Sequence, residues 1–283
     1  MPPTPPVVLT IAGFDPSSGA GITADIKTIA AHGCYGVACI TALTVQSTAG
    51  VRRTKATDTS LVTETLEELH QDVEIAAVRI GMLGSAMVAQ AVATFLEKTH
   101  LPNVVLDPIL KSSSGADLLE RSGTRVLAER LLPLCTVVTP NVDEAAALTG
   151  LPVTNPEEMR AAASKLNAMG APGVVVTGGH LDQAIDLLGF TAASGDFEFE
   201  TFKSEKQKSN STHGTGCAFA SSIACHLALG RGVPDAVLLA KAYVSAAISN
   251  AHPLGKGVGP VHHLFRITEP RRPERSHEPE PQH

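Results

Sequence analysis

The chain has 283 residues, which is long enough to bury a core without disulfide or metal cross-links. Hydrophobic residues make up 43% and aromatic residues only 4%, which favours aliphatic parallel sheets covered by Ala-rich helices over an aromatic-rich β-sandwich. The formal charge of −6 and the lack of a long basic run argue against nucleic acid and acidic membrane surfaces as main partners.

The cysteines and the N-terminus narrow the class of protein further. There are five cysteines, an odd number, and no CxxC pair, so neither a disulfide framework nor a zinc site is expected. Residues 1–6 hold four prolines and no charge, which predicts a flexible N-terminus and not a signal peptide. No apolar run reaches the roughly 18 residues that a membrane span needs. We therefore expect a cytoplasmic protein.

Predicted strands and helices alternate along the chain. In the first half, strands are predicted at 7–12, 36–42, 76–80 and 103–106, with helices at 19–32, 59–73 and 85–98. In the second half, strands are predicted at 136–139 and 173–177, a hairpin at 184–191 and 197–202, and helices at 123–131, 142–148, 156–169, 214–229 and 233–252. This order predicts βαβ units, a mostly parallel sheet and helices on both faces.

Domain organisation follows from the same pattern. Residues 7–266 are expected to form a single domain, because the alternation continues through them without a linker. Residues 267–283 are charged, rich in proline and without periodicity, which predicts a disordered tail.

Several unusual residues follow predicted strand ends. In parallel sheets, ligands bind beyond the carboxyl ends of the strands, so such residues are expected to share one site. They are Gly13, Gln46, Gly81, Asp107, Asn141 and Gly178.

The segment Thr212-His213-Gly214-Thr215-Gly216-Cys217 precedes a predicted helix. Its glycines let the backbone approach an anion, and the N–H groups and dipole of the helix then favour phosphate. The alternative is an ordinary glycine-containing helix cap. We interpret the segment as the phosphate-binding and catalytic loop.

Cys217 is expected in the first turn of that helix. A helix N-terminus lowers the pKa of a thiol, and a thiolate could accept the proton of a substrate hydroxyl during phosphoryl transfer. The alternative is a buried small residue that only packs.

Two further groups of polar residues suit a small-molecule ligand. Asp25 and Gln46 could hydrogen-bond an amino group and a heteroaromatic ring edge. Asp107 and Glu144 are candidate Mg²⁺ partners, since Mg²⁺ takes one or two carboxylates together with substrate phosphates. For Asp25 and Glu144 the alternative is a solvated carboxylate near a helix start.

One familiar motif is set aside. Residues 19–24 match the dinucleotide fingerprint GxGxx(G/A) after a strand. The turn from Gly13 is too long, and 41–48 lacks the acidic residue that the fingerprint requires. These glycines are expected to approach another small ligand.

The full set of motifs resembles one enzyme family, hydroxymethylpyrimidine/phosphomethylpyrimidine kinase of thiamine biosynthesis. The resemblance covers about residues 7–265. It rests on Ala12-Gly13-Phe14-Asp15-Pro16-Ser17, Gly19-Ala20-Gly21-Ile22, Ala24-Asp25-Ile26-Lys27-Thr28, Thr41–Gln46, Arg79-Ile80-Gly81-Met82-Leu83, Thr139-Pro140-Asn141 with Glu144-Ala145, Gly178-Gly179-His180, Thr212–Cys217 and Gly255–His263.

The resemblance implies a ribokinase-like α/β/α sandwich and two ATP- and Mg²⁺-dependent phosphorylations at one site. The first acts on 4-amino-5-hydroxymethyl-2-methylpyrimidine and the second converts its monophosphate to the pyrophosphate. It also implies a homodimer. The implied sites are Gly13, Ala20, Asp25, Gln46 and Met82 for the pyrimidine, Gly214, Thr215, Gly216 and Cys217 for catalysis, Asn141, Thr177, Gly179 and Thr212 for the nucleotide, and Asp107 and Glu144 for the metal.

The chain departs from the resemblance around the nucleotide. Thr177 stands where many relatives have Lys, which removes a possible cation near the phosphates. A pyridoxal or pyridoxine kinase, or an enzyme with both activities, is the main alternative. A sugar kinase would have Asp where this chain has Cys217, and a non-catalytic pyrimidine-binding protein would lack the glycine loop or the Mg²⁺ carboxylates, both of which this chain keeps.

Overall fold

A computed structural model describes residues 3–112, 115, 117–179, 184–204 and 209–267. Its centre is a nine-stranded sheet with the order β3-β2-β1-β4-β5-β6-β7-β8-β9. The strands from β2 to β7 in this order are parallel, and β3, β8 and β9 pair antiparallel at the two edges. The strands are β1 Val7–Phe14, β2 Tyr35–Ser47, β3 Gly50–Ala56, β4 Ile75–Ile80, β5 Val104–Leu106, β6 Val137–Val138, β7 Gly173–Gly178, β8 Ala184–Thr191 and β9 Phe197–Ser204.

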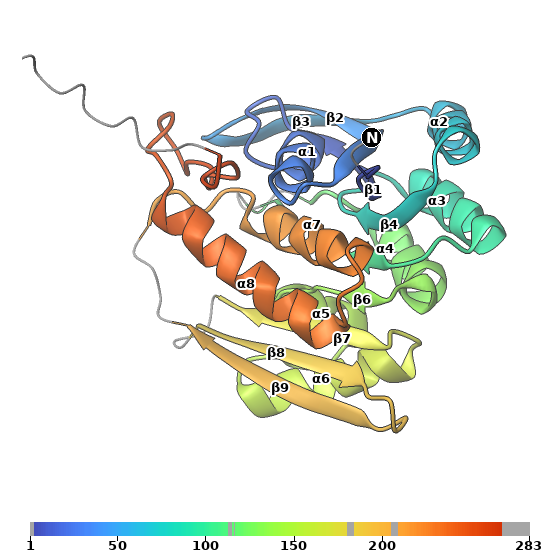
Figure 1. Ribbon diagram of the computed structural model, residues 1–283, viewed down its shortest axis with the longest axis vertical. Coiled ribbons are helices and arrows are strands. Elements are labelled where there is room, and N and C mark those ends of the chain that lie inside the picture. Colours follow the sequence, from blue (N-terminus) through green and yellow to red (C-terminus); the bar gives the residue numbers. More distant parts are fainter. Residues whose placement is uncertain (1–2, 113–114, 116, 180–183, 205–208, 268–283) are drawn as a thin grey trace, which may run out of the picture.

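Helices cover both faces of this sheet (Figure 1). One layer holds α1, α7 and α8, which pack against one another, and the other holds α2 to α6. The predicted three-layer α/β/α sandwich is confirmed. The helices are α1 Gly21–Ala31, α2 Thr59–Asp72, α3 Ala86–Thr99, α4 Arg121–Val126, α5 Val142–Thr149, α6 Pro156–Ala168, α7 Thr215–Ala228 and α8 Val233–Ser249.

Local chemistry explains several helix ends. Asn155 caps α6 by accepting hydrogen bonds from the backbone of Glu157 and Glu158, and Pro156 occupies the first turn. Asn141 and Glu144 form a capping box at the start of α5, which ends at Gly150 in the left-handed conformation. These ends were readable from the sequence.

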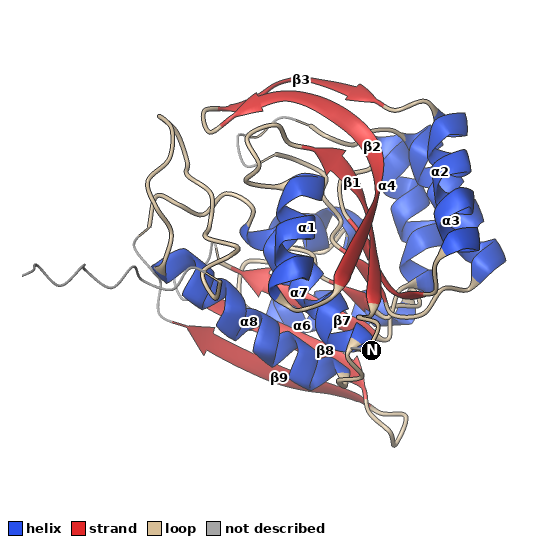
Figure 2. Ribbon diagram, turned by 45° about the horizontal axis from the view of Figure 1, so that its top comes forward, coloured by secondary structure: helices blue, strands red, loops and turns tan. Residues whose placement is uncertain are grey.

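The β2–β3 ribbon differs from the sequence prediction. The predicted strand ended at residue 42, whereas β2 continues to Ser47 and pairs with β3, which the sequence pattern did not reveal. Leu43 and Val45 are exposed in β2, and β3 holds Arg52, Arg53 and Lys55, so the buried-strand pattern is missing. Figure 2 shows the ribbon curving away from the edge of the sheet. Gln46 therefore lies within a strand and not after one.

The two chain ends are only partly described. Pro6 accepts a backbone hydrogen bond from Tyr35 at 2.9 Å, so the chain is anchored to the sheet just before β1. The predicted tail, apart from Ile267, lies outside the described residues. Within the described ranges, no helix combines the length and apolar character that crossing a bilayer requires.

His263 gives the fold a pH dependence. The side chain is buried, and burial lowers its pKa to about 3. The unfolded chain takes up this proton near pH 6.5, whereas the folded chain does so only near pH 3. The free energy of unfolding should therefore fall as pH drops from about 6.5, by up to about 1.4 kcal/mol per pH unit.

Urea unfolding of His263→Gln between pH 7 and 5 measures this contribution. The slope of stability against pH should be smaller than in the wild type, while His70→Gln, which changes an exposed histidine of α2, should keep the wild-type slope. Parallel slopes for the wild type and His263→Gln would contradict the assignment.

Candidate functional site

The carboxyl ends of the parallel strands meet the N-terminus of α7. Strands β1, β4, β5, β6 and β7 are consecutive in the sheet, so the residues that follow their ends lie along one edge. Of the residues expected to share a site, Gly81, Asp107 and Asn141 follow the ends of β4, β5 and β6. Gly13 and Gly178 lie at the ends of β1 and β7, and Gln46 lies near the end of the neighbouring strand β2. Gly216 of α7 lies beside the residue after β5, since a Cβ built on it would be 3.8 Å from Asp107 Oδ2.

The loop before α7 interlocks with the loop before α1. Gly214 has a φ of 82° and forms the N-cap of α7, and a Cβ there would lie 1.8 Å from the carbonyl oxygen of Gly19. Both the backbone conformation and the close contact therefore require glycine. No side chain of the described residues caps α7. The Thr215 N–H donates to the carbonyl oxygen of Thr212 at 3.3 Å, and the next N–H groups, those of Gly216 and Cys217, remain for an anion.

Cys217 is the third residue of α7 and its side chain is buried. Burial raises the pKa of the thiol to about 12, although the nearby Arg79 guanidinium and Gly21 amide favour the thiolate. The expectation that the helix N-terminus lowers this pKa is wrong for the ligand-free protein. Desolvation outweighs the helix dipole, so the thiol carries its proton at neutral pH.

A buried arginine lies beneath this loop. Arg79 of β4 is completely buried, and its guanidinium forms ion pairs with Asp25 at 3.1 Å and with Asp107 at 2.8 Å. Gly81 makes room for it, since a Cβ there would lie 1.8 Å from Arg79 Nη1. Sequence reasoning gave Arg79 no role, although a charged residue inside an apolar strand was a visible signal.

Asp25 is part of this buried network and is not exposed to solvent. Its Oδ2 accepts a hydrogen bond from Thr10 at 2.7 Å and its Oδ1 accepts one from Ser221 at 2.9 Å. Burial raises the pKa of Asp25, and Arg79, Thr10 and Ser221 oppose that shift. The alternative of a solvated first-turn carboxylate is wrong, because Asp25 faces the sheet and α7 and joins them to α1.

Asp107 and Glu144 are two buried carboxyl groups whose charges interact. Burial raises the pKa of Asp107 to about 6, with Arg79 opposing. Burial and the charge of Asp107 raise the pKa of Glu144 to about 8. Glu144 also accepts a hydrogen bond from the backbone N–H of Asn141 at 2.9 Å. The two carboxyl groups place oxygen atoms that can act as metal ligands at the ends of β5 and β6.

The structure brings the residues expected to bind the pyrimidine near the α7 loop. A Cβ on Gly13 would lie 2.9 Å from the Met82 sulfur, and a Cβ on Gly214 would lie 3.5 Å from Ala20 Cα. Gln46 reaches His213 of the loop, with 3.2 Å between its amide nitrogen and His213 Nε2. His213 was quoted only as part of the loop, and sequence reasoning gave it no role of its own.

Three of the residues expected to bind the nucleotide, Asn141, Thr177 and Gly179, lie at the ends of β6 and β7, and Thr212 lies in the loop before α7. Asn141 and Thr177 form a parallel bridge, and the Thr177 N–H donates to the carbonyl oxygen of Pro140 at 2.9 Å. Thr212 and Gly179 are exposed. In strand order, Asn141, Thr177 and Gly179 lie at β6 and β7, toward the opposite edge of the sheet from Gln46 in β2, as two substrates meeting at one loop would require.

Beside Thr177 lies a cation that the sequence did not reveal. Lys241 of α8 forms an ion pair with Asp186, which is paired with Thr177 across β7 and β8 and accepts a hydrogen bond from the Gly178 N–H at 3.0 Å. This chain has Thr177 where many relatives have Lys, but Lys241 still places a positive charge at this edge of the sheet.

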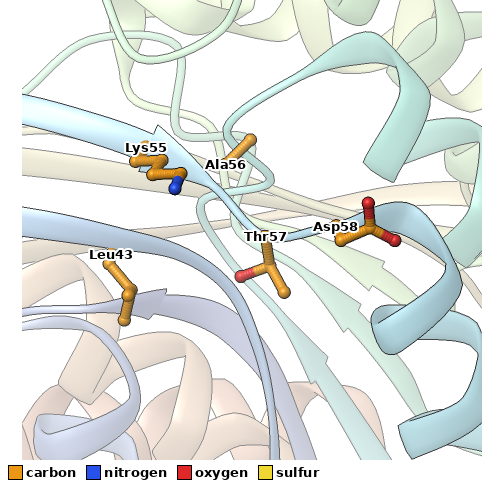
Figure 3. Close-up of a pocket in the computed structure, with 5 residues that line it drawn as sticks. All are labelled: Leu43, Lys55, Ala56, Thr57 and Asp58. Carbon is orange, nitrogen blue, oxygen red and sulfur yellow. The ribbon is translucent and has the colours of Figure 1, made fainter.

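A separate surface hollow of about 360 Å³ lies where the β2–β3 ribbon meets α2 (Figure 3). Leu43, Lys55, Ala56, Thr57 and Asp58 line it. None of the expected site residues does so, and Asp58 is engaged as the cap of α2. The hollow is therefore not part of the site at α7.

Solved structures place the fold in the ribokinase-like class of kinases. The chain is similar to the pyridoxal kinase of Bacillus subtilis, solved as an ADP complex, with a TM-score of 0.84, 33% identity and coverage of 94% of this chain and 100% of that one. It is also similar to the phosphomethylpyrimidine kinase of Clostridium difficile 630, with a TM-score of 0.76, 36% identity and coverage of 86% and 99%.

Sequence comparison then gives the family. Residues 15–262 match the phosphomethylpyrimidine kinase model, and the chain belongs to this family. It is 42% identical to the hydroxymethylpyrimidine/phosphomethylpyrimidine kinase of Streptomyces coelicolor, over 95% of this chain and 98% of that protein. It is also 42% identical to the thiamine biosynthesis bifunctional protein ThiED of Geobacter sulfurreducens, but it spans only 53% of that longer protein.

The ion network makes a direct prediction about stability. Arg79→Met leaves Asp25 and Asp107 buried without their positive partner, which should reduce the free energy of unfolding by about 3–5 kcal/mol. Urea unfolding monitored by circular dichroism measures the change. Arg79→Lys keeps the charge but loses the fork that reaches both carboxylates, and should lose less stability. A loss below about 1 kcal/mol for Arg79→Met would show that the network does not support the fold.

Proposed function

We propose that the chain transfers the γ-phosphoryl group of ATP to 4-amino-5-hydroxymethyl-2-methylpyrimidine and then to its monophosphate, giving the pyrophosphate used in thiamine biosynthesis. The observation that carries this proposal is the family match, which runs from residue 15 to residue 262 and includes the whole α7 loop. Seven of the curated relatives with this dual name are 39–42% identical to the chain.

The phosphate side of the site rests on α7. The N–H groups of Gly216 and Cys217 lie at the positive end of a 14-residue helix, where they can bind the phosphoryl group as it moves between donor and acceptor. Phosphoryl transfer needs positioning and charge neutralisation more than covalent chemistry. Asn141, Thr177, Gly179 and Thr212 are proposed to bind the nucleotide. The ADP complex of the similar pyridoxal kinase supports a nucleotide in this fold.

Asp107 and Glu144 fit Mg²⁺ by their chemistry. Both offer carboxylate oxygens, and their pKa values are raised by burial and by nearby negative charge, that of Asp25 for Asp107 and that of Asp107 for Glu144, which a cation would relieve. The described residues contain no cluster of three or more His, Cys, Asp or Glu side chains arranged to hold a metal. Substrate phosphates and water would thus complete the coordination. When bound, Mg²⁺ would neutralise phosphate charge.

Gly13, Ala20, Gln46 and Met82 are proposed to contact the pyrimidine ring. Gln46 can match the ring edge with a donor and an acceptor. Asp25 is proposed to support the site without contacting the substrate, because both its oxygens are engaged by Thr10, Ser221 and Arg79. We therefore place it beneath the site, where it holds α1, β1 and α7 together.

Cys217 is proposed to accept the proton of the substrate hydroxyl. Because its thiol is protonated in the ligand-free protein, this thiol must first release its own proton to solvent, and the resulting thiolate then takes the proton of the substrate hydroxyl. Arg79 lies beside the sulfur and stabilises the thiolate. Cys217→Ala should lower kcat by about 10²–10⁴-fold while the KM for the pyrimidine changes little. Unchanged turnover in this variant would rule out the proton-acceptor role.

A pyridoxal kinase activity is the second candidate. Its support is the structural similarity to the Bacillus subtilis pyridoxal kinase, which covers 94% of this chain. The two kinds of kinase share this fold, and both substrates are alcohols on an aromatic ring. Only a measurement can therefore separate the two activities.

Steady-state assays with hydroxymethylpyrimidine, its monophosphate and pyridoxal, each with ATP and Mg²⁺, test the proposal. The kcat/KM values for the two pyrimidines should exceed that for pyridoxal. Phosphorylation of pyridoxal alone would replace the proposal with the second candidate, and formation of the monophosphate without the pyrophosphate would remove its second step.

We also propose that the protein is a homodimer. The support is exposed apolar side chains on β2, namely Tyr35 at its start and Leu43 and Val45 on the ribbon at the edge of the sheet. Burial of these side chains against a second copy would remove apolar surface from water.

A further inference from the structure

The loop before α1 and the loop before α7 are joined by one polar contact. His213 Nε2 lies 2.8 Å from Asp15 Oδ2, and both side chains are largely buried. A Cβ on Gly19 would lie 2.3 Å from the His213 ring, so a larger residue there would displace the imidazole. His213 therefore has a fixed place between the two loops.

The protonation of this pair follows from its partners. Asp15 Oδ1 accepts hydrogen bonds from the Ser17 N–H at 2.8 Å and hydroxyl at 2.7 Å, and its Oδ2 accepts one from the Ala20 N–H at 3.0 Å. Burial raises the pKa of Asp15, but the hydrogen bonds from His213 and Ser17 outweigh burial and the net pKa is lowered. Asp15 is thus an acceptor only, and His213 Nε2 carries the hydrogen between them.

That hydrogen fixes the orientation of the Gln46 amide. The nitrogen and the oxygen of a Gln amide have nearly the same shape, so the hydrogen-bond partners must show which end is the nitrogen and which is the oxygen. A nitrogen that carries a hydrogen has no lone pair to accept another, so the end of Gln46 that lies 3.2 Å from His213 Nε2 cannot be the NH₂ group; as the oxygen, it shares with Asp15 the hydrogen on Nε2. The amide oxygen therefore faces His213, and the amide nitrogen occupies the other end.

The other end of the amide agrees with this assignment. It lies 3.2 Å from Thr44 Oγ1, whose single hydrogen is donated to the carbonyl oxygen of Phe14 at 2.9 Å. Thr44 Oγ1 can then accept a hydrogen bond from the Gln46 nitrogen. In this arrangement every group has a suitable partner, whereas the reverse arrangement places two donors against each other at His213.

We propose that Asp15 and His213 are positioning residues that lock Gln46 in one orientation, so that the site accepts a ring with an amino group beside an unprotonated ring nitrogen. The second N–H of Gln46 is left for the ring nitrogen, and the second lone pair of its oxygen is left for the amino group. A 4-oxo ring presents the reverse pattern, with an acceptor beside an N–H. This inference rests on the proposed function and adds the basis of its substrate selectivity.

Isothermal titration calorimetry measures the selectivity without turnover. The probes are 4-amino-5-hydroxymethyl-2-methylpyrimidine and its 4-oxo analogue, bound to the full-length protein. The wild type should bind the amino compound at least about tenfold more tightly, because the locked amide leaves the oxo compound with unpaired groups. In His213→Leu the amide can rotate, and the ratio should fall to within about threefold.

Two further variants separate positioning from general damage. His213→Gln can place an N–H near the Nε2 position and should retain most of the preference, whereas Asp15→Asn should lose it. Asp15→Asn keeps the size of the side chain and carries the test alone if His213→Leu does not fold. His70→Gln, on the exposed face of α2, is the control and should match the wild type.

The outcomes separate the proposed kinase function from the inference about Gln46. If the wild type binds neither pyrimidine, the proposed function fails and the inference fails with it. If the wild type prefers the amino compound and both Asp15→Asn and His213→Leu keep the full preference, the inference alone is overturned.

Discussion

The site depends on a positive charge that is completely buried. Arg79 sits in the middle of the sheet, and its guanidinium is held by Asp25 and Asp107. Removing a charge from water costs several kcal/mol, so such a group is kept only where partners surround it. Here the partners come from α1 and from the end of β5, and Cys217 of α7 lies close by. One ion network thus fixes the elements from which the site is built.

The ion network also affects the groups that are proposed to take part in the reaction. Asp25 ties α7 to α1 and β1 through Ser221 and Thr10, which sets the direction in which the α7 N–H groups point. The same charge stabilises the Cys217 thiolate against burial. The interlock of Gly214 with Gly19 then allows the loop before α7 and the loop before α1, proposed to bind phosphate and pyrimidine, to meet without intervening side chains. The proposed binding and proton transfer would therefore share one set of contacts with the fold.

Much of this architecture was predictable because it follows local rules. Continuous apolar runs predicted β1 and β7, the residue pattern predicted helices at α5 and α6, and the glycines around Thr215 predicted a backbone anion site. These features depend on residues close in sequence. The family resemblance supplied the pyrimidine and nucleotide residues as a set, which no single motif would have justified.

The remaining features are set by contacts between distant residues. Strand β3 is polar and forms by pairing with β2, so no apolar pattern marks it. Asp25 looked like a ligand contact, yet its partners are 15, 54 and 196 residues away (25−10, 79−25, 221−25). The pKa of Cys217 follows its burial, which the sequence does not show. His213 gains its role only because a loop 198 residues away supplies Asp15.

The most direct test of the buried network is a double-mutant cycle on Arg79→Met and Asp25→Asn, measured by urea unfolding. If the two groups stabilise each other, the double variant should lose less stability than the sum of the single losses, by at least about 1 kcal/mol. If the losses add within about 0.5 kcal/mol, Arg79 and Asp25 act independently and the ion network does not organise the site.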